Sequence, residues 1–133
     1  MKSGRRPSWG FLMATVGYMA WIYFLASLPG TATGPDTPFW RFAGNAFHIP
    51  LYAGLGACLA LTLAQWQWPA RATWTVAIGL AYAVVDEWHQ AWVPGRSASA
   101  ADVGLDGMGL ALAVAGLWWL SRRHAALAEA GAR

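Results

Sequence analysis

Charged residues are scarce in this chain, and cysteine is almost absent. Only 11% of its 133 residues are charged, whereas about a quarter is usual in soluble globular proteins. Hydrophobic residues make up 57% of the chain. This composition argues against an ordinary soluble domain and indicates an integral membrane protein. The single cysteine, Cys58, excludes an intramolecular disulfide, and its position in an apolar run favours a small core residue.

The sequence also lacks a basic patch interleaved with exposed aromatic residues, so no nucleic-acid partner is expected. The net charge of +3 is concentrated at the two ends of the chain, which suits the anionic headgroups of membrane lipids. The terminal basic residues are Lys2, Arg5, Arg6, Arg122, Arg123 and Arg133.

Four apolar runs are present, each near the length of about 20 residues that a bilayer core requires. The sequence therefore predicts a single all-α domain over 1–133, an integral membrane bundle of four transmembrane helices. The expected spans are 9–28, 46–64, 73–92 and 102–120. The first run follows a basic start, as in a signal peptide, but it is long enough to span and no clear cleavage site follows. Tryptophans lie near the expected helix ends, as is typical of residues at the headgroup layer: Trp9, Trp40, Trp66, Trp68, Trp92, Trp118 and Trp119.

The distribution of basic residues predicts the orientation. An even number of spans places both termini on one side, and the positive-inside rule makes that side the cytoplasm. The loop that contains Arg71 is then cytoplasmic as well. The loops 29–45 and 93–101 face outward.

Four of the six acidic residues fall within 81–109. Asp86 and Glu87 lie near the outer end of the third span, and Asp102 and Asp106 at the outer start of the fourth. Ionisable side chains at membrane depth are costly and normally face a bundle interior or a wet cavity. We therefore predict an outward-facing polar pocket, lined by residues from several helix ends: His48, Asp86, His89, Arg96 and Asp102.

Three chemistries fit this set of residues. The carboxylates and histidines could bind a divalent metal ion, although no diagnostic metal-binding spacing is present. Asp86, Glu87 and His89 could act as general acid or base, and the planar fork of Arg96 suits a phosphate group. The expected substrate-binding residues are His48, Gln90, Arg96, Asp102 and Asp106.

Each residue also has a structural interpretation. Asp86 and His89 could form a pair that joins helices, and Glu87 could be solvated at the interface. Asp102 completes an S-x-x-D capping box with Ser99. His48 could be a helix-start histidine, and Arg96 an ordinary loop charge.

The pattern resembles the VanZ-like family of small bacterial membrane proteins. The matching segments are Ser27-Leu-Pro29, His48-Ile-Pro-Leu-Tyr52, and the run from Asp86-Glu87-Trp-His89-Gln90 through Pro94-Gly95-Arg96 to Asp102. The resemblance adds Tyr52 to the expected substrate-binding residues. Members of the family often carry Asp-Lys before the position of His48, where this chain has Gly44-Asn45, and Asn is common at the position of Asp106. Without that lysine, more of any anion binding depends on Arg96.

The resemblance implies a multi-pass protein of the bacterial cytoplasmic membrane, and it links the family to resistance against teicoplanin, a glycopeptide antibiotic. One hypothesis is a site that binds or acts on an envelope lipid or a lipid-linked phosphate. A non-catalytic scaffold is the second, and a proton or ion pathway is the third. The apolar inner halves of the four runs argue against a continuous pathway.

Overall fold

The computed structural model describes residues 9–30 and 45–132. This part of the chain is all helical and contains α1 (Trp9–Ser27), α3 (His48–Thr62), α4 (Trp68–Gln90) and α5 (Ala100–Gly131). The all-α prediction is therefore confirmed for the described residues. Several residues that the sequence interpretation used lie outside them: Lys2, Arg5, Arg6, Trp40, Gly44 and Arg133.

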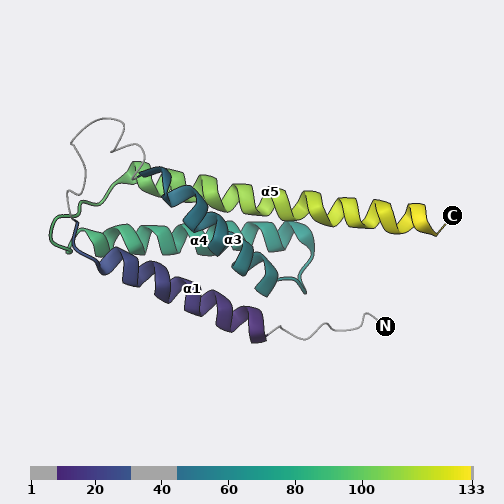
Figure 1. Cartoon of the computed structure of the whole chain (residues 1–133), viewed down its shortest axis with the longest axis horizontal. Coiled ribbons are helices and arrows are strands. Elements are labelled where there is room, and N and C mark those ends of the chain that lie inside the picture. Colours follow the sequence, from purple (N-terminus) through teal and green to yellow (C-terminus); the bar gives the residue numbers. More distant parts are fainter. Residues whose placement is uncertain (1–8, 31–44, 133) are drawn as a thin grey trace.

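The four helices form a bundle in which the end of α1, the start of α3, the end of α4 and the start of α5 lie at the same end (Figure 1). Helix α3 packs most extensively on α5 and also contacts α1 and α4. The sequence predicts this convergence of helix ends, which brings together residues that are far apart in the chain. Helix α5 continues to Gly131, beyond the expected end at residue 120, and projects past the other three helices (Figure 1).

Small residues allow the helices to approach closely around Leu110, which is fully buried. The side chain of Leu110 fills the space that a Cβ would occupy at Gly79 of α4, and it also contacts Gly56 of α3. Gly109 faces the backbone of α3 directly, with no space for a Cβ beside Ile49 and Ala53. Packing of this kind is typical of helices in membranes. No hydrophobic driving force brings such helices together, and small residues let them associate by close contact.

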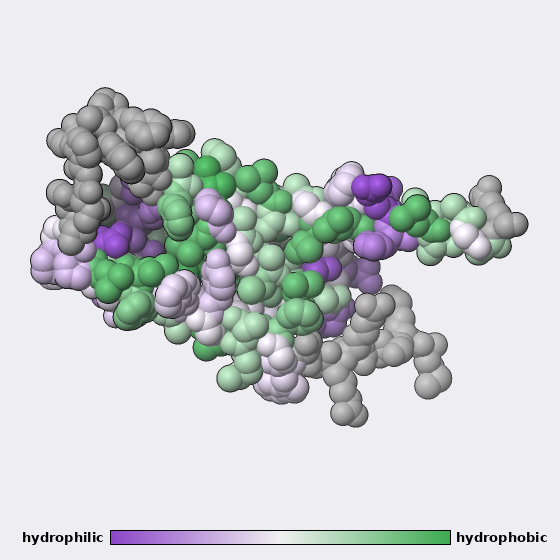
Figure 2. Space-filling view, in the orientation of Figure 1, coloured by the Kyte–Doolittle hydropathy of each residue, from purple (hydrophilic) through white to green (hydrophobic). Residues whose placement is uncertain are grey.

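The outer surface of the bundle is unusually apolar. Large hydrophobic side chains are exposed along α1, α4 and α5, and most of the tryptophans are among them, for example Trp9, Trp88 and Trp92. Figure 2 shows hydrophobic and weakly polar residues over the middle of one face, with the strongly hydrophilic residues toward the two ends. A surface of this kind suits lipid better than water.

Two helices, α1 and α5, are long and apolar enough to cross a membrane. Only 17% of the residues in each apolar window are buried, so they differ from the core helices of a soluble protein. Helix α3 has 15 residues and is about 22 Å long, shorter than a bilayer core of about 30 Å. Helix α4 is long enough but carries Arg71, Asp86 and Glu87. The structure thus supports two of the four expected spans.

Candidate functional site

The start of α5 forms one half of the capping box that the sequence predicts. Ser99 is the N-cap residue, and its hydroxyl accepts a hydrogen bond from the backbone N–H of Asp102 at 3.3 Å. The backbone N–H of Ser99 in turn donates to Glu87 Oε2 at 2.7 Å. The cap therefore joins the beginning of α5 to the end of α4, and it leaves the carboxylate of Asp102 free of the capping role.

His48 and Asp106 form a pair between α3 and α5. His48 Nδ1 lies 2.9 Å from Asp106 Oδ1, and the Asp106 side chain is completely buried. This contact is the only salt bridge among the described residues. It fixes the orientation of the imidazole ring, so that its second nitrogen, Nε2, is free to face another group.

Arg96 connects the loop after α4 to the end of α1. Its Nε donates to the carbonyl oxygen of Leu28 at 3.0 Å, and Nη2 donates to that of Leu25 at 3.0 Å. Leu25 belongs to the last turn of α1, where carbonyls lack helical partners, and Leu28 follows directly after the helix. Gly95, with a φ of 76°, provides the left-handed turn that directs Arg96 toward α1. A third, longer bond of 3.4 Å runs from Nη1 to Gln90 Oε1.

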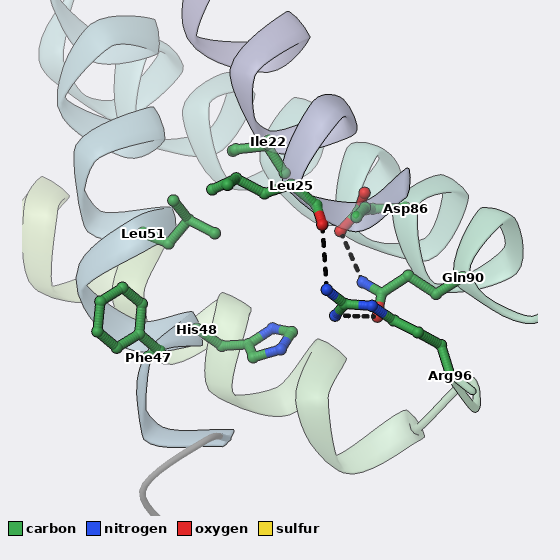
Figure 3. Close-up of a pocket in the computed structure, with 9 residues that line it drawn as sticks. Ile22, Leu25, Phe47, His48, Leu51, Asp86, Gln90 and Arg96 are labelled. Carbon is green, nitrogen blue, oxygen red and sulfur yellow. Dashed lines mark hydrogen bonds between the residues drawn. The ribbon is translucent and has the colours of Figure 1, made fainter. Parts of the chain in front are cut away.

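A pocket of about 160 Å³ lies between these elements. Its polar lining comes from His48, Asp86, Gln90 and Arg96. Figure 3 shows the His48 ring and the Arg96 guanidinium group pointing toward one another across it. Its apolar wall is formed by Ile22, Leu25, Ala26, Phe47 and Leu51. The pocket therefore combines a cation and an imidazole with a hydrophobic side.

Among the described residues, no arginine or lysine forms a salt bridge with the carboxylates around this pocket. Within the described ranges no salt bridge joins Arg96 to an acidic residue, because its bonds go to two carbonyls and an amide. Asp86 is 4% exposed, and only its Oδ2 has a partner, the amide of Gln90 at 3.1 Å. Buried oxygens of three aspartates have no hydrogen-bond partner among the described residues: Asp86 Oδ1, Asp102 Oδ1 and Asp106 Oδ2. A buried carboxylate without a partner is costly in its charged form.

Two of the predicted pocket residues, His89 and Asp102, lie outside the pocket lining. His89 stacks on Tyr23 of α1 with ring centroids 4.3 Å apart, and its Nε2 lies 3.0 Å from Ser27 Oγ. The structure thus separates His89 from the pocket that Asp86 lines. The end of α4 is covered by α5 as well as by α1, so Asp86 and Glu87 are both buried and His89 faces α1.

Tyr52 is also outside the lining. It is completely buried in the core with Leu55 and Leu110, and its hydroxyl has no partner in the described part of the chain. Its ring lies 6.5 Å from that of Tyr82. In this structure Tyr52 packs between helices and does not contact the pocket.

The sequence interpretation missed the contribution of α1. Ile22, Leu25 and Ala26 form part of the pocket wall, and carbonyls of α1 hold Arg96. No charge or spacing marks these apolar residues. The only signal was the Ser27-Leu-Pro29 segment that follows them.

The lipid-compatible surface, the two apolar helices and the polar pocket at one end indicate a small helical membrane protein. A family model described as VanZ/LLP1 matches residues 8–122, so the chain belongs to the VanZ/LLP1 family, as the sequence motifs predicted. No curated protein and no solved structure shows significant similarity to the chain.

Proposed function

We propose that this protein crosses the bacterial cytoplasmic membrane four times and binds the phosphate of an envelope lipid, or of a lipid-linked phosphate, in an outward-facing pocket. The observation that supports this most directly is the position of Arg96. Its guanidinium group lines the pocket, yet it forms no ion pair with the described acidic residues.

The donors of Arg96 are only partly used. A guanidinium group has five N–H donors, and Nε, Nη1 and Nη2 each use one on Leu28, Gln90 and Leu25. One N–H on each terminal nitrogen has no partner among the described residues. Two such donors on a planar group match two oxygens of a phosphate. The bonds to α1 also hold the group in place before a ligand arrives, which reduces the entropy cost of binding.

The size and wall of the pocket agree with a headgroup as ligand. At about 160 Å³ it is smaller than the sites of about 300–1,000 Å³ that enclose drug-sized molecules. A phosphate fits such a space, and the apolar wall that includes Phe47 and Leu51 suits the first carbons of a lipid chain. The rest of the lipid chain would lie along the exposed apolar surface of the helix bundle.

The carboxylates near the pocket supply the groups that a reaction would need. Asp86 lines the pocket and Glu87 is buried next to it in the chain, and they are the groups that would act as general acid or base. His89 stacks on α1 and would support the site by its contact with Ser27. The family association with teicoplanin resistance fits a protein that changes or binds an envelope lipid.

A matched pair of ligands tests the binding. We expect the purified protein in detergent to bind farnesyl phosphate and to bind farnesol at least tenfold more weakly, since only the phosphate can use the two remaining donors of Arg96. Isothermal titration calorimetry measures both. Equal binding of the alcohol and the phosphate would contradict a phosphate site and leave only a hydrophobic groove.

The orientation is tested separately by labelling of introduced cysteines. With Cys58 replaced by Ser, we expect Ser97→Cys to react with a membrane-impermeant maleimide in intact cells, because the loop between α4 and α5 faces outward in this topology. Ala130→Cys, at the end of α5, should react only after the membrane is opened. Reaction of Ala130→Cys from outside would reverse the topology and place the pocket on the cytoplasmic side.

A further inference from the structure

Three potential metal ligands from three helices meet beside the pocket. His48 of α3, Glu87 of α4 and Asp102 of α5 each offer one ligand atom, and these atoms lie within 4.8 Å of one another. A tetrahedral site with bonds of about 2.0–2.2 Å separates its ligand atoms by about 3.3–3.6 Å. The three side chains therefore need to approach one another by about 1 Å to surround an ion.

The side chains are already oriented by neighbouring groups. Asp106 binds Nδ1 of His48, which leaves Nε2 as the free nitrogen, and carboxylate–histidine pairs of this type commonly orient metal-binding histidines. Glu87 receives the backbone N–H of Ser99 on Oε2 and the amide of Gln90 on Oε1, the latter at 3.4 Å. Such contacts fix a carboxylate while leaving lone pairs available for coordination.

A second and separate observation favours a bound cation. Asp86 is 4% exposed and shares the pocket lining with His48, but its Oδ1 has no partner among the described residues. Asp102 Oδ1, in the group of three, and Asp106 Oδ2, beside His48, are buried and unpartnered in the same way. Since Arg96 forms no ion pair with these acids, a positive ion is the group that would compensate them.

We propose that His48, Glu87 and Asp102 bind one divalent metal ion of the Mn²⁺ or Zn²⁺ type. One imidazole nitrogen and two carboxylate oxygens suit these ions, and three protein ligands leave a coordination position open. Asp86 is outside this group of three, but it lines the adjoining pocket together with His48. That the open position receives the lipid phosphate rests on the function proposed above, whereas metal binding itself does not.

Mn²⁺ binding to the purified full-length protein in detergent, without added lipid phosphate, tests the site. We expect about one Mn²⁺ per chain by electron paramagnetic resonance, and at least tenfold weaker binding in Glu87→Gln and in Asp102→Asn. Glu129→Gln, an exposed acid near the end of α5, is the matched control and should bind like the wild type. Wild-type affinity in both folded site variants would overturn the proposal.

Pulsed electron paramagnetic resonance provides a readout that does not depend on those variants being folded. The wild type should show coupling of Mn²⁺ to one imidazole nitrogen, and His89→Gln and His124→Gln should retain it. His48→Gln should lose it. Absence of nitrogen coupling in the wild type, or its loss in His89→Gln, would overturn the site. Farnesyl phosphate binding measured without metal reports separately on Arg96, so the two proposals can fail independently.

Discussion

Replacement of Arg96 by Gln is expected to weaken farnesyl phosphate binding by about 10- to 100-fold and to abolish function in a complementation assay. One hydrogen bond to a charged group contributes about 1.5–3 kcal/mol. Since about 1.4 kcal/mol corresponds to a tenfold change, the net loss of one such bond gives this range. Arg96→Lys should bind with intermediate affinity, because lysine retains the charge but not the planar fork. Calorimetry on the purified variants measures the loss.

Two controls separate binding from folding in this experiment. Arg122→Gln removes an exposed arginine of α5 that stacks on Trp118, and it should bind like the wild type. Arg96 also bonds to the end of α1, so thermal unfolding must be followed in parallel. Asp86→Asn keeps the shape of the side chain, and we expect it to lose function with little change in unfolding temperature. Full function in both Arg96→Gln and Asp86→Asn would remove the binding-site interpretation, and unfolding of both would favour a scaffold.

The second large effect is expected at Gly109, where α3 and α5 are in closest contact. An added Cβ would overlap the carbonyl oxygen of Ile49 and lie 2.9 Å from the nitrogen of Ala53. Both obstacles are backbone atoms, so the helices must move apart. We expect Gly109→Ala to lower the free energy of unfolding by about 1–3 kcal/mol, as measured in detergent, since overpacking of a tight core has this magnitude.

Gly116 provides the matched control on the same helix. No atom lies within 4 Å of a Cβ placed there, so Gly116→Ala should stabilise α5 by about 0.5–1 kcal/mol through helix propensity. Gly109→Ala should also reduce Mn²⁺ binding, because Gly109 is one turn from Asp106 and separation of α3 from α5 would break the His48–Asp106 pair. A stabilising effect at both glycines would contradict the close packing of these helices.

The fold could be predicted in large part because its signals are local. The apolar runs, Pro29-Gly30 and Pro94-Gly95 predict most helix ends to within a few residues, and Ser99 marks the start of α5. The extension of α5 to Gly131 could not be read from hydropathy, because Arg122 and Arg123 end the apolar run although the helix continues. The short length of α3 was equally hidden, since the apolar sequence continues past Thr62.

The site was predictable only where ionisable residues lie at helix ends that the expected topology brings together. The ends of α3, α4 and α5 that carry His48, Asp86 and Asp106 do come together. The rotation of α4 about its axis decides whether Glu87 or His89 faces the aspartates of α5. Helical periodicity alone does not determine that rotation. The hydrogen bonds from Arg96 to carbonyl oxygens at the end of α1 depend on the backbone turn at Gly95. The distribution of charged residues in the sequence does not reveal that turn.

The central claim is that Arg96 holds a lipid phosphate in the pocket, and a solid-state NMR distance measurement tests it most directly. The protein, labelled with ¹⁵N in its arginine side chains, is placed in galactolipid bilayers, so that added farnesyl phosphate supplies the only phosphorus. We predict that ³¹P dephases the guanidinium signal that disappears in Arg96→Gln. Dephasing confined to Arg71, Arg122 or Arg123, with none at Arg96, would contradict a phosphate site in this pocket.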